Sequence, residues 1–495
     1  MTSPGSRSPC ALIWFREDLR LADNPALTAA VASGVPVTAL FVLDETTDGF
    51  RPLGGASRWW LAQSLKAHGR ECAKTGLPFA VRKGPERAVI ERAVRECGAT
   101  RVLWSRRYGE PEATIDADLQ RALEESGVAV ETLGGRLLHE PDAVRSGSGA
   151  PFKVYTAFWR AARAGGPPRA PLPAPSRADV VAGPQLAGDE LGDLGLEPRG
   201  GPDWARGLRA SWTPGEAGAR AALDAFLDGG LRGYAAARDR PDLSGTSRLS
   251  PHLRFGEISP VQLWHASEAA MAEGSAQARD VEKFRGELGW REFAYHLLAA
   301  FPDMARRNAA ARFDDFPWRQ PEAAELKAWR RGLTGYPIVD AGMRQLWRTG
   351  WMHNRVRMIT ASFLIKDLLV DWRIGEAWFW DTLVDADPAN NAVSWQWVAG
   401  SGADAAPYFR VFNPVLQGRK FDPSGDYVRT FLPELGEIPT KWIHAPWEAP
   451  AEALSAAGVE LGRHYPRPIV DHAAARKRAL AALAQVSGRV SAPDD

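Results

Sequence analysis

The sequence has few cysteines, no long apolar segment and almost no net charge. Its 495 residues include three cysteines, Cys10, Cys72 and Cys97, without metal-ligand spacing, which excludes a disulfide framework and a four-cysteine iron–sulfur cluster. A membrane-spanning helix needs an apolar run of about 18 residues, and the sequence has none of that length. The N-terminus lacks the apolar core of a signal peptide. A cytoplasmic protein is therefore expected. Because the net charge is only +1, any affinity for nucleic acid has to come from a local basic face.

Residues 1–140 alternate apolar runs with helical patterns. This alternation predicts an α/β domain with a parallel, Rossmann-like sheet covered by helices on both faces. The candidate strands are residues 11–15, 35–44, 77–84, 101–109 and 128–135. Such sheets bind ligands at the carboxyl ends of their strands, but the fold alone names no ligand.

The remaining chain changes character twice. Residues 141–210 are rich in Pro, Gly, Ala and Ser and are expected to form an irregular interdomain connector, with disorder as the alternative. Trp159 indicates that part of this connector is docked. Residues 211–485 show helical periodicity almost throughout and predict an all-α domain, followed by a short frayed tail over 486–495. Helices are expected near residues 216–227, 259–273, 280–301, 337–350 and 355–370.

The stretch from Trp372 to Trp397 is unusually rich in tryptophan. Its acids, amides and indoles are Asp385, Asp387, Asn390, Asn391, Trp372, Trp378, Trp380, Trp395 and Trp397. An indole is large, oxidisable and able to stack on flat rings. The cluster therefore indicates a flat aromatic ligand, a flipped base or an electron path, with a tryptophan-rich helical core as the alternative.

Two shorter segments carry polar groups at positions that could bind a ligand. Residues 245–260 open with small hydroxyl residues that can cradle a phosphate at a helix start beside Arg248, although Ser and Thr also cap helices without any function. In residues 287–293, Glu287 and Trp290 are three positions apart and share a helix face. A salt-bridged core helix is the alternative there.

Basic residues are locally in excess between Gly335 and Arg373. The cations are Arg344, Arg348, Arg355, Arg357, Lys366 and Arg373, and the acids are Asp340, Asp367 and Asp371. Trp347, Trp351 and Met358 are interleaved with them, which predicts a phosphate-tracking face beside stacking groups. A solvated basic helix is the alternative.

Together these segments resemble the photolyase/cryptochrome family over about residues 11–480. The resemblance rests on WFREDLRLADNPAL, GTSRLSPHLRFGEIS, ELGWREF, TGYPIVDAGMRQLWRTGWMHNRVRMITASFL, DWR and ANNAVSWQWVAGSGADAAPYFRVFNP. Within the family the chain is most similar to bacterial cyclobutane pyrimidine dimer photolyases of the class III or class I branch. The resemblance implies an antenna-chromophore domain, a helical domain that binds FAD, and light-dependent repair of UV-damaged DNA.

The resemblance also implies roles for individual residues. FAD is expected to contact Tyr234, Arg238, Thr246, Ser247, Arg248, Leu249, Ser250, Arg291, Arg357, Asp385, Ala386, Asp387 and Asn391. The catalytic set is expected to be Glu287, Trp290, Asn354, Met358, Asn391 and Trp397, and the DNA contacts Glu287, Trp290, Arg291, Asn354, Arg355, Arg357, Trp397 and Arg410. Asn391 would face flavin N5, where plant cryptochromes carry aspartate. Because an amide is no acid, it favours the anionic reduced flavin that repair requires.

Two further expectations concern light harvesting and electron supply. Trp395, Trp372 and Trp318 match the family's photoreduction chain, but Trp318 is one residue further from Trp329 than in relatives, and Trp380 and Trp378 offer a different exit. Glu112 follows YGEP at the position of a folate-binding glutamate, but proline precedes it where the folate pattern has asparagine. A 5,10-methenyltetrahydrofolate antenna is expected, with a deazaflavin or an empty site as rivals.

Repair is favoured over three alternatives. A cryptochrome photosensor usually carries a long C-terminal extension, and few residues follow the last expected helix here. Repair of (6-4) photoproducts uses a histidine pair where this chain has Trp351 and Met352. The third alternative is a non-photochemical flavoprotein or a helical nucleic-acid-binding protein. A monomer without an obligate protein partner or a metal is expected.

Overall fold

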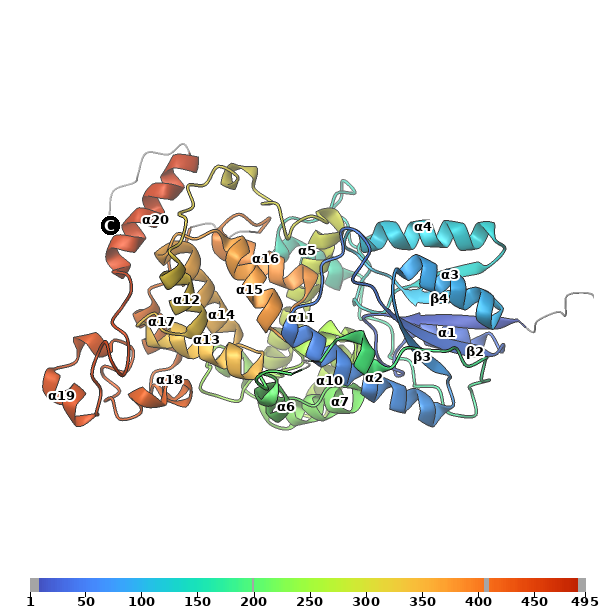
Figure 1. Ribbon diagram of the computed structural model, residues 1–495, viewed down its shortest axis with the longest axis horizontal. Helices are drawn as coiled ribbons and strands as arrows, with labels where there is room; N and C mark the ends of the chain where they lie inside the picture. The colour runs from blue at the N-terminus through green and yellow to red at the C-terminus, as the bar shows by residue number, and fades with distance from the viewer. Residues whose placement is uncertain (1–8, 198–199, 405–408, 488–495) are drawn as a thin grey trace, which may run out of the picture. The chain divides into compact units, whose positions relative to one another are not determined.

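The computed structural model describes residues 9–197, 200–404 and 409–487 (Figure 1). By its contacts the chain divides into two compact units. The sheet unit comprises residues up to Phe152, Thr156–Arg232 and Ser247–Pro302; the helical unit comprises Lys153–Tyr155, Gly233–Thr246 and residues from Asp303 onward. Much of the segment between 211 and 302 thus groups with the sheet, and the domain boundaries expected at 140 and 210 remain predictions.

The sheet unit is built on a five-stranded parallel sheet with the order β3-β2-β1-β4-β5. Its strands are β1 (Cys10–Phe15), β2 (Val37–Leu43), β3 (Phe79–Lys83), β4 (Ala99–Ser105) and β5 (Ala129–Leu133). The predicted strands all form, and the α/β prediction is confirmed. Every residue of β1 and β2 is buried, as expected for parallel strands covered on both faces. The strand order reverses between β1 and β4, which makes the carboxyl ends of these strands the switch point of the sheet.

Helices cover both faces of this sheet. α3 (Glu86–Cys97) and α4 (Glu112–Glu125) pack against the face that carries Cys10, Leu12 and Trp14. α2 (Gly55–Thr75) lies on the other face, where its His68 ring contacts Phe15 with 4.4 Å between ring centres. The unit also contains α1 (Pro25–Ala32), α5 (Tyr155–Ala164) except its first residue, η1 (Leu191–Leu194), α6 (Arg206–Ser211), α7 (Glu216–Ala225), η2 (Phe226–Gly230), α9 (Ser250–Arg254), α10 (Pro260–Ala272) and α11 (Ala278–Ala300).

Part of the segment expected to be an irregular connector is helical and docked. Phe158 of α5 is fully buried, with its ring centre 5.3 Å from that of Phe293 on α11. The neighbouring Trp159 packs edge-on against Trp264 of α10. Apolar burial of these rings holds α5 in place although the surrounding sequence is rich in Pro and Gly.

The helical unit consists of helices and connecting turns. They are α8 (Tyr234–Ala237), η3 (Ala311–Phe313), α12 (Ala323–Arg331), α13 (Pro337–Thr349), α14 (Asn354–Ser362), η4 (Phe363–Asp367), α15 (Trp372–Thr382), α16 (Pro388–Ala399), α17 (Pro414–Phe421), α18 (Asp426–Phe431), η5 (Pro433–Leu435), η6 (Pro446–Glu448), α19 (Ala451–Ala456) and α20 (His472–Ser487). One large core cluster joins α13 to α16. Among the described residues, no helix is long and apolar enough to cross a membrane.

Two predicted elements end differently from expectation. The helix expected over 355–370 stops at Ser362 and continues as the wider, π-helical turn η4, which turns Lys366 and Asp367 into the interior. At the other end of the unit, α20 reaches Ser487 and therefore includes the first two residues of the expected tail. The rest of that tail, residues 488–495, lies outside the described residues.

Candidate active site

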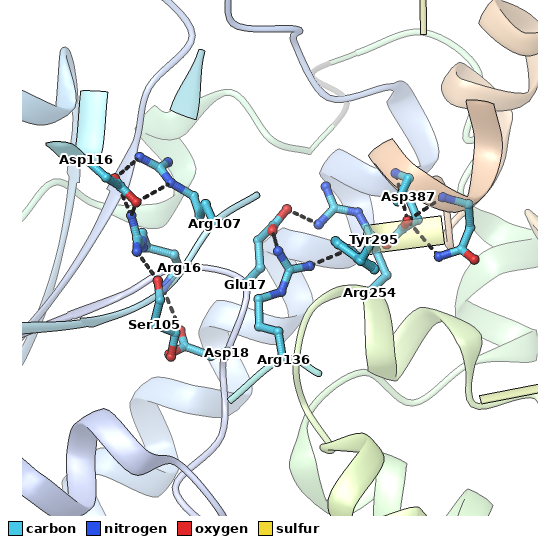
Figure 2. A network of polar contacts seen from close by, with 12 residues as sticks. Arg16, Glu17, Asp18, Ser105, Arg107, Asp116, Arg136, Arg254, Tyr295 and Asp387 are labelled. Atoms are coloured by element: carbon cyan, nitrogen blue, oxygen red, sulfur yellow. Dashed lines mark hydrogen bonds and ion pairs between the residues drawn. The ribbon is translucent and has the colours of Figure 1, made fainter. Parts of the chain in front are cut away.

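The tryptophan-rich stretch folds as α15, a short link and α16. Asp387 ends the link and caps α16: its Oδ1 accepts hydrogen bonds from the backbone N–H groups of Ala389 and Asn390 at 3.0 and 2.8 Å (Figure 2). Such a cap stabilises a helix by about 1 kcal/mol. Ala386 is buried beside it. The cap fixes where α16 begins and so the direction in which Asn391 and Trp395 leave the helix.

Asp385 carries a buried oxygen that fits a ligand. Its Oδ2 accepts from Nη2 of Arg357 at 2.8 Å, and Nε of Arg357 donates to the Met352 carbonyl at 2.7 Å. The other carboxylate oxygen of Asp385, Oδ1, is buried and has no hydrogen-bond partner among the described residues. Because an unpaired buried acceptor costs about 1–3 kcal/mol, this oxygen fits a donor on a bound molecule, such as the ring N–H of a flavin.

Asn391 has its amide orientation fixed from within the protein. Nδ2 donates to Oε1 of Glu376 at 2.7 Å and to the Glu376 carbonyl at 3.1 Å. Both side chains are buried. Since the amide N–H groups point at α15, the amide oxygen is the group that Asn391 can offer to a bound ring. Asp385 and Asn391 together therefore fit a cofactor that presents N–H groups, as FAD does.

The three expected relay tryptophans lie in one packed region of the helical unit. Trp395 and Trp372 are buried in the core cluster, and Trp318 packs at its edge and is half-exposed. Gly375 leaves room for the Trp395 ring, because a Cβ at that position would lie 2.2 Å from Cη2 of Trp395. Trp318 also contacts the cluster formed by Phe316 and the alanines of α20. This arrangement fits an electron path, whose function stays a prediction.

The alternative exit is also built into the structure. Trp380 is buried in the core cluster, and Trp378 stacks on Trp347 with 6.0 Å between ring centres and an interplanar angle of 5°. Trp347 is 62% exposed, and the guanidinium of Arg330 lies 4.9 Å from the centre of the Trp378 ring. An indole pair therefore reaches the surface on this side as well.

The residues expected to hold the flipped base divide between the two units. Glu287 and Trp290 share one face of α11 in the sheet unit, and Lys283 lies 3.3 Å from Oε1 of Glu287. In the helical unit, Asn354 is the exposed first residue of α14, and Met358 and Trp397 are half-buried. Each set has the exposure that ligand contact requires.

Arg291 has a structural environment that the sequence did not indicate. Its guanidinium is buried on α11, where Nη1 donates to the Arg136 carbonyl at 2.7 Å and the group lies 4.9 Å from the centre of the Tyr295 ring. Its expected contacts with FAD and DNA remain predictions, and the observed contacts fix α11 within the sheet unit.

The expected phosphate cradle is also divided. Ser247, Arg248, Leu249 and Ser250 precede and begin α9 in the sheet unit, whereas Thr246, Tyr234 and Arg238 belong to the helical unit. Arg248 adopts φ of 53°, and its guanidinium lies 4.2 Å from the centre of the Trp212 ring. Tyr234 starts α8 and is buried, and Nη1 of Arg238 lies 3.5 Å from Oδ1 of Asp239.

The basic face expected between residues 335 and 373 does not form as predicted, because most of its charges are paired. Arg344, Arg355, Arg357 and Arg373 form ion pairs with Glu434, Asp239, Asp385 and Asp371. Burial lowers the pKa of Lys366 to about 7, and its ammonium donates to the Arg410 carbonyl. Burial likewise lowers the pKa of His353 to about 4, so this imidazole is a neutral helix cap. Lys366 and Arg348 have no ion pair within the described part of the chain.

Five cations, most of them without an ion pair among the described residues, gather instead around a cavity of about 750 Å³ in the helical unit. The cations that line it are Arg355, Arg410, Lys420, Arg476 and Lys477. Arg355 pairs with Asp239 at 2.8 Å, whereas the other four have no ion pair among the described residues. Lys420 and the pair on α20 were not identified from the sequence, because their charges converge only through the folding of distant segments. Arg410 was identified by the resemblance alone.

Ion pairs fill the carboxyl edge of the sheet near the expected antenna residue. Arg16, after β1, donates to Asp116 at 2.6 and 2.8 Å, and Arg107, after β4, pairs with the same carboxylate (Figure 2). Arg107 also pairs with Glu86 at 2.8 Å. Glu112 begins α4 beside this network, and burial raises the pKa of its carboxyl. The switch point is thus occupied by the protein's own side chains, and Glu112 lies at their margin.

The sequence did not identify two residues that hold site side chains in place. Glu376 orients Asn391 from a position 15 residues earlier, and Asn308 accepts the indole N–H of Trp372 across 64 residues. Neither lies in a motif. A carboxylate one helical turn after Trp372 and one before Trp380, on the same helix face as both indoles, was the one available signal for Glu376.

A parallel-sheet unit followed by a helical unit with this arrangement of amide, carboxylate and tryptophans defines the photolyase/cryptochrome class of flavoproteins. Two family models match the chain: DNA photolyase over residues 11–176 and FAD binding domain of DNA photolyase over residues 284–485. The second match supports FAD as the cofactor. The chain belongs to the DNA photolyase family.

Individual relatives agree with this assignment. The chain is 51% identical to deoxyribodipyrimidine photo-lyase of Agrobacterium fabrum, over 96% of this chain and 98% of the relative. It is 39% identical to cryptochrome-1 of Arabidopsis thaliana, over 96% of this chain and 70% of the relative. A bacterial class III photolyase from Agrobacterium tumefaciens has a crystal structure that superposes with a TM-score of 0.93 at 50% identity, covering 99% of this chain and all of the other.

Proposed function

We propose that this chain is a deoxyribodipyrimidine photo-lyase, which repairs cyclobutane pyrimidine dimers in UV-damaged DNA with FAD and light. The observation that carries the proposal is the amide of Asn391, whose N–H groups are committed to Glu376. An amide held in this way offers an oxygen and no acidic proton to the reduced cofactor, which keeps the cofactor in its anionic, electron-donating form. The 51% identical photo-lyase supports the same activity.

The chemistry that bound, reduced FAD supplies is light-driven donation of one electron to the dimer, with return of the electron after the ring has opened. The chain's own residues bind and orient. Asp385 would accept a ring N–H on its unpaired Oδ1, with Arg357 holding the carboxylate in place. Ser247, Ser250 and Arg248 would bind the phosphates near the start of α9.

The dimer would be held by broad aromatic rings and by a few polar side chains. Trp290 and Trp397 present broad rings on which a flipped, non-planar pyrimidine pair can pack, and Glu287 would accept the N–H of a thymine edge. Asn354 and Met358 lie four positions apart on one face of α14 and would line the pocket. The energetic role of these contacts is to offset the cost of unstacking the dimer from the helix.

The DNA backbone would be bound by the cations around the cavity of the helical unit. Arg355 follows Asn354 directly and lines this cavity, so the expected lesion contact and the basic cavity meet at the start of α14. Phosphate contacts of this kind position a duplex without reading its sequence. The protein would act as a monomer.

A folate antenna at Glu112 is part of the proposal. Burial raises the pKa of this carboxyl, and its oxygens could hydrogen-bond the N–H groups of a pterin-type ring. The absorption spectrum of the purified holoprotein tests this point, because a methenyl-folate, a deazaflavin and FAD alone give different bands. Glu112→Gln should remove the folate band and leave the FAD band.

Light-dependent repair tests the main proposal. The purified protein with chemically reduced FAD is illuminated with blue light in the presence of an oligonucleotide that carries one thymine dimer, and repaired strands are counted by chromatography. Restored thymines in the light and none in the dark are expected. Bound, fully reduced FAD without repair would refute the proposal and favour a photoreceptor of the cryptochrome kind.

A further inference from the structure

The buried indole of Trp372 is connected to the surface by an amide. Trp372 is fully buried, and its Nε1–H donates to Oδ1 of Asn308 at 2.9 Å. Nδ2 of Asn308 in turn donates to Oδ1 of Asp314 at 2.7 Å. Asp314 is exposed and Asn308 is half-buried. The second hydrogen bond decides how the amide is turned, so its oxygen is held against the indole N–H.

This orientation matters only when the indole is oxidised. An indole that has lost one electron is a far stronger acid than the neutral ring, and it passes its N–H proton to any base within hydrogen-bond reach. An amide oxygen accepts a hydrogen bond but cannot be protonated near neutral pH. The carboxylate of Asp314 contacts the amide group of Asn308, on the side away from its oxygen.

The other charges beside Trp372 do not supply a base. The guanidinium of Arg373 lies 4.9 Å from the centre of the Trp372 ring, and it is paired with Oδ2 of Asp371 at 2.9 Å. The positive charge of Arg373 disfavours oxidation of the Trp372 ring. The carboxylate of Asp371, with which it is paired, partly cancels this effect. The negative charge of Asp314, one amide further away, favours the oxidised ring without accepting its proton.

We propose that Asn308 is a positioning residue that keeps oxidised Trp372 protonated, so that the electron vacancy moves on to Trp318 and is not trapped in the interior. The inference rests on the proposed light-driven function. In this step one electron passes from Trp372 to Trp395 and the Trp372 N–H bond stays intact. A second transfer, from Trp318 to Trp372, restores the buried ring. Trp318, which is half-exposed, then releases its N–H proton to water. An external thiolate returns one electron and becomes a thiyl radical, and water returns the proton, which restores the neutral indole.

The test replaces the amide by a base of the same size. In Asn308→Asp the new carboxylate can take the indole proton, so Trp372 should remain as a neutral tryptophan radical. Flash absorption and electron paramagnetic resonance of the FAD-loaded protein should show this buried neutral radical, with loss of the Trp318 radical and of light-driven cofactor reduction. Repair by chemically reduced protein should be unchanged, since it does not use this path.

Asn308→Leu is the matched control, because leucine has a similar shape and no acceptor. Water that reaches the uncovered indole N–H is a weaker base than a carboxylate, so this variant should lower the Trp318 radical less than Asn308→Asp does. In the dark and without FAD, NMR should detect faster solvent exchange of the Trp372 indole N–H in Asn308→Leu. Equal loss of the Trp318 radical in both variants would mean that Asn308 acts only through packing, and an unaltered radical in Asn308→Asp would also overturn the proposal. Trp372→Phe distinguishes a wrong role for Asn308 from a wrong electron path. If Trp372→Phe leaves light-driven cofactor reduction intact, the path through Trp372 is itself refuted.

Discussion

The amide of Asn391 donates a hydrogen bond to the carboxylate of Glu376. Replacing the amide by a carboxyl group would introduce a titratable proton at this position. Their hydrogen bond is 2.7 Å long. In Asn391→Asp two carboxyl groups would meet at this distance, and two such groups cannot both be ionised, so the pair would share a proton near neutral pH. An acid would then stand where the amide stands now.

We therefore expect Asn391→Asp to make repair pH-dependent. As the pH falls, the shared proton becomes available to the reduced cofactor and repair should fall; as the pH rises and the pair loses its proton, repair should recover. Repair yields of chemically reduced protein between pH 6 and 9, at saturating substrate, check this. The double variant Asn391→Asp with Glu376→Gln removes the coupling and should shift the profile, whereas a flat profile in the single variant would contradict the pairing argument.

Residue types were predictable where a motif carries them, and their partners were not. The amide at 391 and the acids at 385 and 387 stand in one short segment, so the sequence was enough to select them. The ion pair that neutralises Arg355 comes from Asp239, 116 residues earlier, and the one for Arg357 from Asp385, 28 residues later. Counting charges along the chain therefore predicted a basic face where the structure has ion pairs, since pairing depends on long-range contacts.

At the scale of elements, α15 and α16 meet through a glycine. A Cβ on Gly375 would lie 2.2 Å from Cη2 of Trp395 and 2.6 Å from Cδ2 of Leu364, both in the core. Gly375→Ala should displace the Trp395 ring and cost about 1–3 kcal/mol, as overpacking of a core does. Light-driven cofactor reduction should slow because the ring moves, while repair by chemically reduced protein should persist.

Gly229→Ala is the control, since nothing lies within 4 Å of a Cβ at that helical position. It should leave stability unchanged or raise it by about 0.4–1 kcal/mol. Thermal unfolding and near-ultraviolet circular dichroism measure both variants. Equal unfolding temperatures for the two would show that the contact between Gly375 and Trp395 is not tight.

Glu17 ties three elements of the sheet unit together. It follows β1 and pairs with Arg136, after β5, and with Arg254, the last residue of α9 (Figure 2). Burial alone would raise the pKa of Glu17, but the charges of the two arginines lower it to about 2, below its ordinary value of 4.5. Because the folded pKa is depressed, the carboxylate stabilises the fold above pH 4.5, and this contribution is lost as the pH falls from 4.5 towards 2.

Glu17→Gln should therefore destabilise the protein at neutral pH, by about 3 kcal/mol, because it leaves two buried guanidinium groups without their counter-charge. The difference from wild type should shrink by about 1.4 kcal/mol for each pH unit below 4.5. Urea unfolding at pH 7 and pH 3.5 measures it. Glu71→Gln, which breaks an exposed pair with Lys74, is the control and should change stability by less than about 1 kcal/mol at either pH.

Elements were more predictable than their ends and groupings. The five strands follow from short apolar runs, and α10, α11 and α13 from clear helical periodicity. The break of the predicted 355–370 helix at η4 was not predictable, because apolar periodicity continues through it and the wider turn serves buried contacts of Lys366 and Asp367. The grouping of residues 247–302 with the sheet likewise depends on contacts such as the one between Trp60 and Glu257, 197 residues apart.

At the scale of the whole molecule, a net charge of +1 leaves nucleic-acid binding to a local set of cations. The structure has such a set around the cavity of the helical unit, where Arg476 and Lys477 stand next to each other on α20, both exposed and without an ion pair among the described residues. If these two side chains contact phosphates, each contributes about one unit to the slope of log K against log salt concentration.

The double variant Arg476→Gln with Lys477→Gln should therefore weaken binding of dimer-containing DNA and lower that slope by about 2. Repair at saturating DNA should be unchanged, because neither side chain belongs to the expected lesion pocket. Fluorescence anisotropy at several salt concentrations gives the slope. Arg331→Gln is the control: Arg331 is exposed at the end of α12, lies outside the cavity and should leave the slope unaltered. The same loss of slope in the control would mean that DNA affinity depends on the overall charge of the protein. An unaltered slope in the double variant would mean that the DNA backbone does not contact Arg476 and Lys477.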